Sequence, residues 1–542
     1  MRSGRNGKEV AYFNGRVYTA NRQAPIAKAF ILRDGRFSAV GDDSIAEGCP
    51  NRVDLQGSCV IPGLVDSHCH MLAALEKAAM GVVDLPSGIR PEELGDVLLR
   101  LIKERDLPKD RVFAAMGISL TQGNFSAEDI DRVIPDRPVI VFSDDVHALL
   151  LNRKAMEWAG IDETTKDPGD KSYFKRDPEG RPTGLVIEIE AMSMCRSLIE
   201  GNEQDPAEIL KETCRQYASY GYTTVFEAMS AYYEDDELFE ALAEFADTDP
   251  GLRISTSFCY RGEKQLHAEE ALAIMKNLRE RFSRKNLICN TLKLISDGTI
   301  EEHSAFLYEP YEDEPDNVGH LMLSVEEMRK MAELAAAEGF HIHIHAIGDR
   351  AAGVILELFE GLGPISGTKT IAHNQLYSEA EIRKIIEAQD VYFQTTPHWV
   401  EADAFTRDCL GEKRYRMQFP IGTMVRNSVR VTFGSDSCLE KNTANPFLGM
   451  YYACARGDAD CEGLCCPPQS EGIGREECLL AYTIDGAGQL GLDRETGSIE
   501  AGKSADFVIL DRDILNCTPE ELKETRVRET FFRGNSSWKP MR

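Results

Sequence analysis

The chain has 542 residues, enough to bury a large core and more than one compact domain usually contains. Its 61 basic and 90 acidic residues give a formal charge of −29, which argues against nucleic-acid binding and disfavours anionic membrane surfaces. The sequence shows neither a signal-peptide pattern nor an apolar run of the ~18–20 residues that a membrane span needs. We therefore expect a cytoplasmic protein that contacts neither nucleic acid nor membrane. A homodimer is compatible with this composition.

The 15 cysteines are scattered along the chain, and without a secretion signal we expect reduced thiols. Their densest group is Cys461, Cys465 and Cys466, in a stretch that also contains Gly and Pro. Because paired C-x-x-C spacing is missing, we interpret this stretch as an ordinary loop rather than a second metal site.

Short apolar runs separated by turns characterise both ends of the chain. At the N-terminal end they lie at 10–20, 29–41 and 52–63, and the turn RDGR in the second run predicts a hairpin. The tail has the same character at 497–515 and 527–534. These patterns predict a small β-sandwich domain built from both termini, in which residues 1–59 and residues 491–542 combine.

The middle of the chain alternates short apolar runs with helical patterns, as a parallel α/β fold does. One such helix is expected to begin at Ser378, because Glu381 three residues later completes a capping-box pattern. Eight strand candidates lie at 60–68, 223–228, 252–258, 287–295, 339–345, 368–373, 391–396 and 429–436. Eight is the number that a (β/α)8 TIM barrel requires, so the fold class is α/β and the barrel spans 60–490.

One connection is too long for a simple crossover. Residues 72–221 separate the first two strand candidates and contain strand-like runs of their own at 111–117 and 137–143. We interpret 72–221 as an inserted subdomain after strand one. Catalytic sites of such barrels lie at the C-terminal strand ends, so this insertion is placed where it can cover the site.

His68 and His70 form an H-x-H pair at the end of the first barrel strand. Side chains two apart in a strand face the same way, so both rings point into the barrel. Two neutral imidazoles side by side suit a shared cation. A lone H-x-H pair can also be a hydrogen-bonded structural feature, so the pair needs further support.

That support comes from the ends of four other strand candidates, which carry Lys293, His345, His373 and Asp436. Each could be explained singly as a core residue or a snorkelling lysine. Their convergence on one barrel rim instead predicts a metal site. In the run HIHIH we assign His345 as the ligand because it lies nearest the rim, and we treat His343 as the weaker candidate for a direct role.

The ordered motifs VIPGLVDSHCH, LKLISDGTI, HIHAIGDRA, IAHNQL and FGSDS resemble the amidohydrolase superfamily, in its YtcJ-like branch that includes N-substituted formamide deformylases. The resemblance spans residues 9 to 535 and implies one or two divalent ions per chain, with zinc as the expected metal. It also implies that Lys293 is carboxylated and bridges two metals, and that Asp436 both binds metal and handles the proton.

Weaker matches place further residues in the substrate pocket. FSDDVHALLLN resembles a family segment and assigns His147 and Asn152 to substrate binding, although Asp145 stands where a glycine is expected. His303 and His398 are assigned to the same pocket. After Lys293 the sequence departs from the family pattern, because His303 occupies an arginine position and Glu301 and Glu302 precede it. This leads us to hypothesise a neutral or cationic substrate, unless the two glutamates simply face solvent.

The predicted reaction is hydrolysis of a non-peptide C–N bond of a small molecule, an amide or an N-acyl or N-formyl compound, by metal-activated water. Three alternatives stay open. The same site could cleave esters or lactones. It could hold one metal beside an unmodified Lys293. The barrel could also be catalytically idle and act as a binding protein, although the complete ligand set argues against this.

Overall fold

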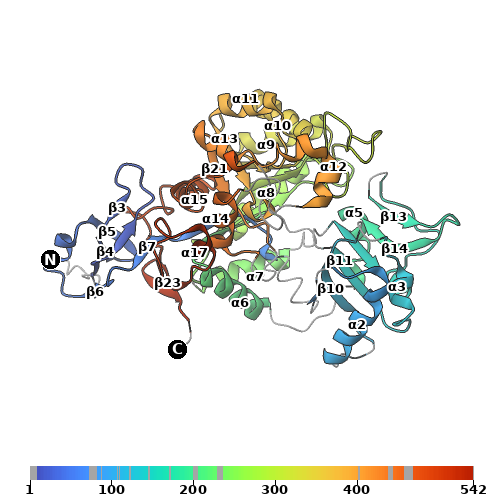
Figure 1. Ribbon diagram of the computed structural model, residues 1–542, viewed down its shortest axis with the longest axis horizontal. Coiled ribbons are helices and arrows are strands. Elements are labelled where there is room, and N and C mark those ends of the chain that lie inside the picture. The colour runs from blue at the N-terminus through green and yellow to red at the C-terminus, as the bar shows by residue number, and fades with distance from the viewer. Residues whose placement is uncertain are drawn as a thin grey trace. The chain divides into compact units, whose positions relative to one another are not determined.

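The computed structural model describes residues 9–540 except 73–81, 87, 106–107, 109, 121–123, 144–146, 170–171, 199–205, 229–235, 249, 401–402, 438–442 and 457–467 (Figure 1). The chain divides into two compact units. As far as they are described, the larger comprises Met1–Leu72, Leu210–Ser230 and Asp235–Arg542, and the smaller comprises mainly Ala73–Ile209.

The larger unit contains a sheet of eight parallel strands, which confirms the predicted barrel. Its strands are β8 (Leu64–Cys69), β15 (Tyr222–Glu227), β16 (Arg253–Cys259), β17 (Leu287–Ile295), β18 (His341–Ala346), β19 (Lys369–His373), β20 (Val391–Thr395) and β21 (Arg430–Phe433). They are hydrogen-bonded in chain order. The segment after β21 meets β8 through Asp436 N, which donates to His68 O at 2.8 Å, so the last strand returns to the first.

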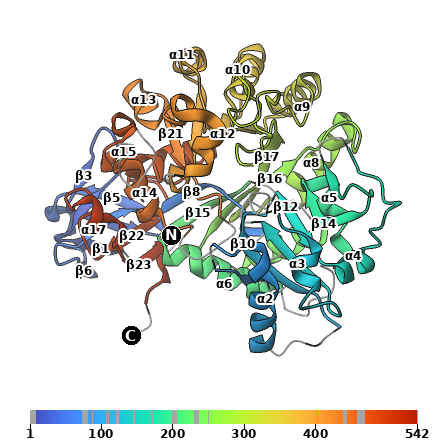
Figure 2. The same ribbon diagram turned by 45° about the vertical axis from the view of Figure 1, so that its right-hand side comes forward.

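Helices lie outside these strands, as Figure 2 shows for α8 to α11. The helices of the larger unit are α6 (Pro206–Ser219, which begins in the smaller unit), α7 (Asp236–Asp247), α8 (Ala268–Phe282), α9 (Val325–Ala337), α10 (Asp349–Leu362), α11 (Glu379–Ala388), α12 (Ala404–Tyr415), α13 (Ile421–Arg426), α14 (Pro446–Cys454), α15 (Arg475–Ala481), α16 (Ile484–Gln489) and α17 (Pro519–Lys523). Short 3-10 helices are η1 (Asp43–Ala46), η3 (Pro397–Val400) and η4 (Gln469–Glu471).

Serine caps begin two of these helices. At α9 the Ser324 side chain accepts a hydrogen bond from Glu327 N, and the Glu327 side chain accepts one from Ser324 N, which is a complete capping box. At α11 the predicted box is not reciprocal: Ser378 accepts from Ala380 N, and its hydroxyl donates to the Glu381 carboxylate. The helix start at Ser378 is therefore right, but its capping box is wrong.

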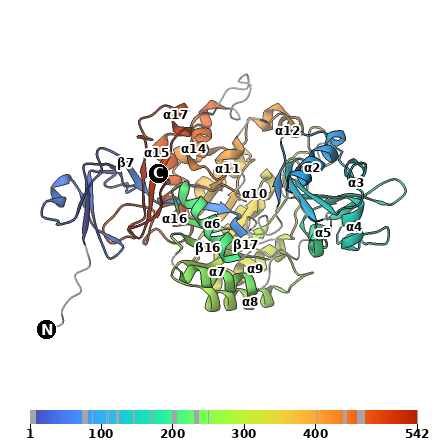
Figure 3. The same ribbon diagram turned by 90° about the horizontal axis from the view of Figure 1, so that it is seen from below.

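The terminal segments form two further sheets; one contains N-terminal strands only, and in the other the blue N-terminal strands lie beside the red C-terminal ones (Figures 1 and 3). One has the order β5 (Arg36–Gly41), β4 (Ala29–Arg33), β1 (Val10–Phe13), β6 (Arg52–Asp54); the other has the order β24 (Asn535–Trp538), β23 (Val527–Phe532), β22 (Phe507–Leu510), β7 (Cys59–Pro62), β2 (Arg16–Tyr18), β3 (Ile26–Ala27). Tyr12 of the first sheet packs against Phe507 and Phe531 of the second, with ring centroids 5.3 and 6.0 Å apart. The predicted sandwich of both termini is thus present.

The predicted first strand, 60–68, consists of two strands. Residues up to Pro62 belong to β7, which pairs with β22 in the terminal sheet, and β8 of the barrel begins at Leu64. Gly63 lies between them, and a Cβ there would be 2.1 Å from Thr223 Oγ1. The chain therefore passes from one sheet to the other through a single residue that has no room for a side chain.

A buried ion pair links the barrel to the terminal sheet. Arg253 of β16 donates through Nη1 to Asp506 Oδ2 at 3.2 Å and to Thr224 Oγ1 at 2.9 Å. The two charged side chains are only 2% and 1% exposed. Asp506 also accepts hydrogen bonds from Thr496 Oγ1, Ser504 Oγ and Arg533 N, so its charge is fully solvated by the protein.

The smaller unit is built around a six-stranded mixed sheet, which is the predicted inserted subdomain. Its strand order is β13 (Tyr173–Arg176), β14 (Pro182–Ile187), β12 (Ala148–Leu151), β11 (Val139–Ser143), β10 (Phe113–Ile118), β9 (Val83–Asp84). Its helices are α2 (Pro91–Arg105), α3 (Ala127–Asp131), α4 (Arg153–Ala159), α5 (Ile189–Ser193) and the 3-10 helix η2 (Arg196–Leu198). The exact domain boundaries given above stay predictions.

Within the part of the chain that the structure describes, no helix is both long and apolar enough to cross a membrane.

Candidate metal centre

The predicted metal ligands lie at the C-terminal ends of their barrel strands. His68 is in β8, His70 follows it by two residues, His345 is in β18 and His373 is the last residue of β19. Lys293 lies near the end of the long strand β17, and Asp436 lies three residues beyond β21. Parallel strands present these ends on one rim, so residues far apart in the sequence converge there.

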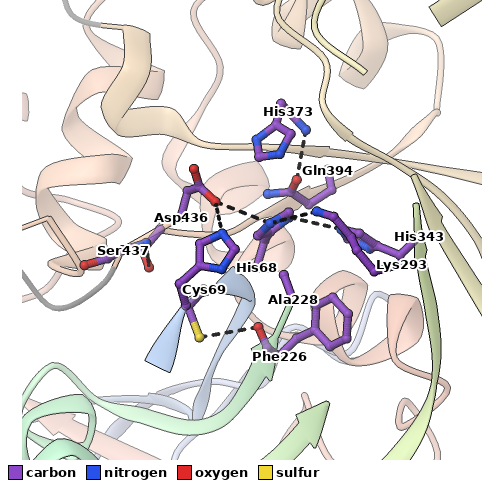
Figure 4. Close-up of polar contacts among 12 residues, drawn as sticks. His68, Cys69, Phe226, Ala228, Lys293, His343, His373, Gln394, Asp436 and Ser437 are labelled. Carbon is purple, nitrogen blue, oxygen red and sulfur yellow. Dashed lines mark hydrogen bonds and ion pairs between the residues drawn. The ribbon is translucent and has the colours of Figure 1, made fainter. Parts of the chain in front are cut away.

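His68 lies at the centre of this group (Figure 4). Its Nε2 is 3.3 Å from Lys293 Nζ and 3.3 Å from Asp436 Oδ1, and its Nδ1 is 3.0 Å from His343 Nε2. Asp436 Oδ1 is also 3.1 Å from His70 Nε2. One carboxylate oxygen therefore faces both rings of the H-x-H pair.

His373 completes the group from the β19 side. One ligand atom each of His68, His373 and Asp436 lies within 4.8 Å of the others. The His373 ring stacks on Trp399 of η3, with centroids 5.0 Å apart and planes 7° apart, which fixes its orientation. Its Nδ1 is buried and has no hydrogen-bond partner among the described residues, so it offers a lone pair to a cation.

His343 lies closer to the centre of the group than the strand pattern suggested. Its ring is buried and lies 4.8 Å from the His68 ring, whereas His345 lies 4.5 Å from the His373 ring. His345 Nε2 is 3.3 Å from Gly298 O and 3.7 Å from Asp297 Oδ1. Both histidines thus face the group from β18, and the ligand role of His345 stays a prediction.

Electrostatics at the rim favour neutral imidazoles. Burial, followed by repulsion from Lys293, lowers the pKa of His68 and His343 well below the ordinary value; for His373 the causes are burial and then His345. Burial also lowers the pKa of Lys293, to about 8. The neutral imidazoles of His68, His343 and His373 near one carboxylate have the chemistry of a divalent-cation site.

The pKa of His70 is shifted in the opposite direction to those of the three neutral rim histidines, because of Asp436. Burial lowers the pKa of His70, but its hydrogen bond and charge attraction to Asp436 outweigh this effect and raise the pKa above its ordinary value. A cation bound at the rim would compete with the His70 proton for the same carboxylate oxygen.

Asp66, which the sequence patterns did not reveal, connects two segments of the rim by hydrogen bonds to its carboxylate. Asp66, fully buried in β8, accepts hydrogen bonds from Ser435 N at 2.9 Å, Ser435 Oγ at 2.6 Å and His68 N at 3.3 Å. It thereby ties β8 to the segment that carries Asp436. An aspartate in an apolar strand two residues before the H-x-H pair is the sequence signal that could have revealed it.

The predicted substrate residues His147 and Asn152 lie in the inserted unit. His147 Nδ1 is 3.0 Å from Glu188 Oε2. Asn152 caps α4: its Oδ1 accepts from Ala155 N and Val139 N, and its Nδ2 donates to two backbone carbonyls. These four bonds use every donor and lone pair of the amide, so Asn152 has a structural role in the inserted unit, and its assignment to substrate binding stays a prediction. Asp145 and the group Cys461, Cys465 and Cys466 lie outside the described residues.

The other two substrate candidates lie in the larger unit. His398, in η3 beside Trp399, places Nε2 2.9 Å from Asn445 O. His303 Nε2 lies 2.9 Å from a carboxylate oxygen of Asp313, and the nearby Glu301 accepts a hydrogen bond from Thr406 Oγ1 at 3.0 Å. Glu301 and His303 are both half-buried, so Glu301 does not simply face solvent. Their roles toward a substrate stay predictions.

Comparison with known proteins agrees with this site. Residues 52–537 match the amidohydrolase family, so the chain belongs to amidohydrolase family 3. It is 30% identical over 78% of its length to the exoenzymes regulatory protein AepA of Pectobacterium carotovorum subsp. carotovorum, 93% of which is covered. It is 26% identical to the putative amidohydrolase YtcJ of Bacillus subtilis, and 25% identical to an N-substituted formamide deformylase of Arthrobacter pascens. Both alignments cover 97% of this chain and 98% of the relative.

The fold also matches a solved structure. An uncharacterized metal-dependent hydrolase from Pyrococcus horikoshii superposes with a TM-score of 0.71 at 23% identity, over 94% of this chain and 99% of that one. Family, fold and the clustered histidines and aspartate together define a metal-dependent hydrolase of the amidohydrolase superfamily.

Proposed function

We propose that this protein hydrolyses a non-peptide C–N bond in a small amide, such as an N-acyl or N-formyl compound. The observation that carries the proposal is the convergence of His68, His373 and the Asp436 carboxylate on one point of the rim. Such a site pairs cation ligands with a group that can move a proton. The relation to an N-substituted formamide deformylase supports the choice of bond.

The residues proposed to hold the metal are His68, His70, Lys293, His345, His373 and Asp436. The buried Nδ1 of His373, which no described residue contacts by a hydrogen bond, and the lowered pKa of that imidazole fit a divalent ion such as zinc. When bound, such an ion lowers the pKa of a water molecule and polarises a carbonyl group. All further chemistry falls to the protein's own side chains.

Lys293 is proposed to carry a carboxyl group. Its amine is buried among histidines, 3.3 Å from His68 Nε2, and a protonated amine there would repel a cation. A carbamate removes this charge and supplies anionic oxygens instead. The side chain would then act as a ligand rather than as an obstacle.

Asp436 is proposed to be the proton carrier. Its Oδ1 faces the two rings of the H-x-H pair at 3.1 and 3.3 Å, among the residues proposed to hold the metal. An amide nitrogen leaves poorly unless it is protonated, so a carboxylate that accepts the water proton and returns it to nitrogen serves both half-steps. An ester oxygen leaves more readily than an amide nitrogen, so ester hydrolysis depends less on this second proton transfer.

A matched substrate panel tests the proposal. N-formyl, N-acyl and cyclic amides would be compared with the esters and lactones of the same acids, on wild type and on Asp436→Asn. We expect the amides to have the higher kcat/KM relative to their uncatalysed hydrolysis, and to lose more activity than the esters in the variant. Preference for esters would support the esterase alternative, and turnover of neither class at full metal loading would support the idle barrel.

A further inference from the structure

A second group of metal-ligand side chains lies outside the barrel ligand set. His303, Asp313 and Cys409 each present a ligand atom within 4.8 Å of the other two. His303 Nε2 is 2.9 and 3.0 Å from the two carboxylate oxygens of Asp313. The three residues come from the segment after β17, the loop that follows it, and α12. We propose that they form a separate, structural zinc site.

The backbone around the group is held in place before any ion binds. Glu312 N donates to Cys409 O at 2.8 Å, which ties the loop to α12. Asn317 Nδ2 donates to His303 O at 3.1 Å, and Tyr311 Oη donates to Ala305 O at 2.9 Å. These bonds connect all three segments. A site whose ligands are positioned by their neighbours loses little entropy when a cation binds.

Local backbone conformation supports the same conclusion. His303 has φ 53°, in the left-handed region that few non-glycine residues adopt. Gly411, two residues after Cys409, has φ 70° and kinks α12. A Cβ at Gly411 would lie 3.0 Å from Glu312 Oε2, the movable end of a side chain, so it is the positive φ rather than this contact that favours glycine here. The left-handed backbone conformations of His303 and Gly411 thus both occur where the loop and α12 come together.

The surroundings of the three residues suit a cation that has one coordination position open to solvent. Cys409 is fully buried in an apolar cluster with Ile300, Leu307 and Leu410. The His303 ring is covered by Tyr311, 4.7 Å away, while the Asp313 side chain is 38% exposed. Apolar walls strengthen the attraction between a cation and its ligands. The exposed side at Asp313 gives an entry path and room for water as the fourth ligand.

The types of ligand atom in this group indicate which metal ion it would bind. Imidazole nitrogen, thiolate sulfur and carboxylate oxygen in a small cluster are ligands typical of zinc. On binding, the Cys409 thiol loses its proton to solvent, and the charges of the thiolate and of Asp313 then balance a divalent ion. A neutral His303 imidazole supplies a lone pair to such an ion.

Cobalt spectroscopy can separate this site from the barrel centre. Cobalt bound to a thiolate absorbs in the near ultraviolet by charge transfer, whereas cobalt bound only by the predicted barrel ligands does not. Full-length protein produced in cobalt-supplemented medium should show this band. Cys409→Ser should abolish the band and lower the metal content by about one equivalent, while Cys214→Ser should leave both unchanged. Cys214 is a matched control because it is buried and burial alone shifts its pKa.

A second variant allows the proposal to be tested even if Cys409→Ser fails to fold. Asp313→Asn changes an exposed side chain, keeps its shape, and should weaken zinc binding by at least about tenfold in a chelator competition. The proposal is overturned if wild type shows no thiolate band, if the band persists in Cys409→Ser, or if Asp313→Asn binds zinc as tightly as wild type. The hydrolytic reaction does not enter either readout.

Discussion

Replacing Asp436 by asparagine should separate proton transfer from metal binding. Asp436 has φ 52°, and asparagine is among the few residues that adopt this left-handed conformation readily, so the backbone should stay in place. The amide keeps an oxygen near His68 and His70 but cannot accept the water proton. Loss of general acid–base catalysis typically costs about 10²–10⁴ in rate. This corresponds to a barrier increase of about 2.7–5.5 kcal/mol.

The assay is kcat on the best amide of the panel, with metal content measured on the same sample. Metal content should fall much less than kcat, because the histidines and Lys293 remain. Asp349→Asn is a suitable control: this buried aspartate follows the HIHAIG run and accepts hydrogen bonds from Tyr308 N and Arg350 N, which an amide oxygen can also accept. Near-normal turnover of Asp436→Asn at full metal loading would refute the assigned role.

Three further predictions concern the metal centre and the link between barrel and terminal sheet. His68→Ala or His70→Ala should lower bound zinc, manganese or iron in elemental analysis, and protein that holds no metal and gains no activity from added ions would contradict the site. Lys293→Ala should lose metal and activity, and a small carboxylic acid should restore part of both; an unmodified amine turned away from the metals in electron density would favour a single-metal centre. Arg253→Met leaves the buried Asp506 charge without its cation and should cost about 3–5 kcal/mol in the free energy of unfolding measured by urea titration. The exposed pair of Arg281 and Glu240 is the control, since Arg281→Ala should cost less than about 1 kcal/mol, and equal losses in the two variants would be the contrary result.

Much of the fold could be predicted because strand and helix periods are local properties. The eight barrel strands and the hairpin at Asp34 and Gly35, both at positive φ, follow from short-range patterns. The division at Gly63 could not be predicted, since an apolar run with one glycine looks continuous. Only the pairing partners of β7 and β8 in the folded protein separate the two strands.

The site shows the same limit. His68, His70 and Asp436 are visible as polar residues at strand ends. The period of two places His343 and His345 on one face, but which of them reaches His68 depends on the stagger and tilt of the strands, which local patterns do not determine. The cluster of His303, Asp313 and Cys409 joins loop and helix positions far apart in the chain, so no spacing rule could have found it.

The single-residue passage through Gly63 has a consequence for folding order. Strand β7 lies inside its sheet, between β2 and β22, and β22 comes from the end of the chain that is synthesised last. During synthesis the strand that carries His68 is therefore anchored to an incomplete sheet until the C-terminal strands emerge. In the finished protein, opening of the terminal sheet pulls directly on β8, so the amide hydrogens of β7 and β8 should exchange as one cooperative unit.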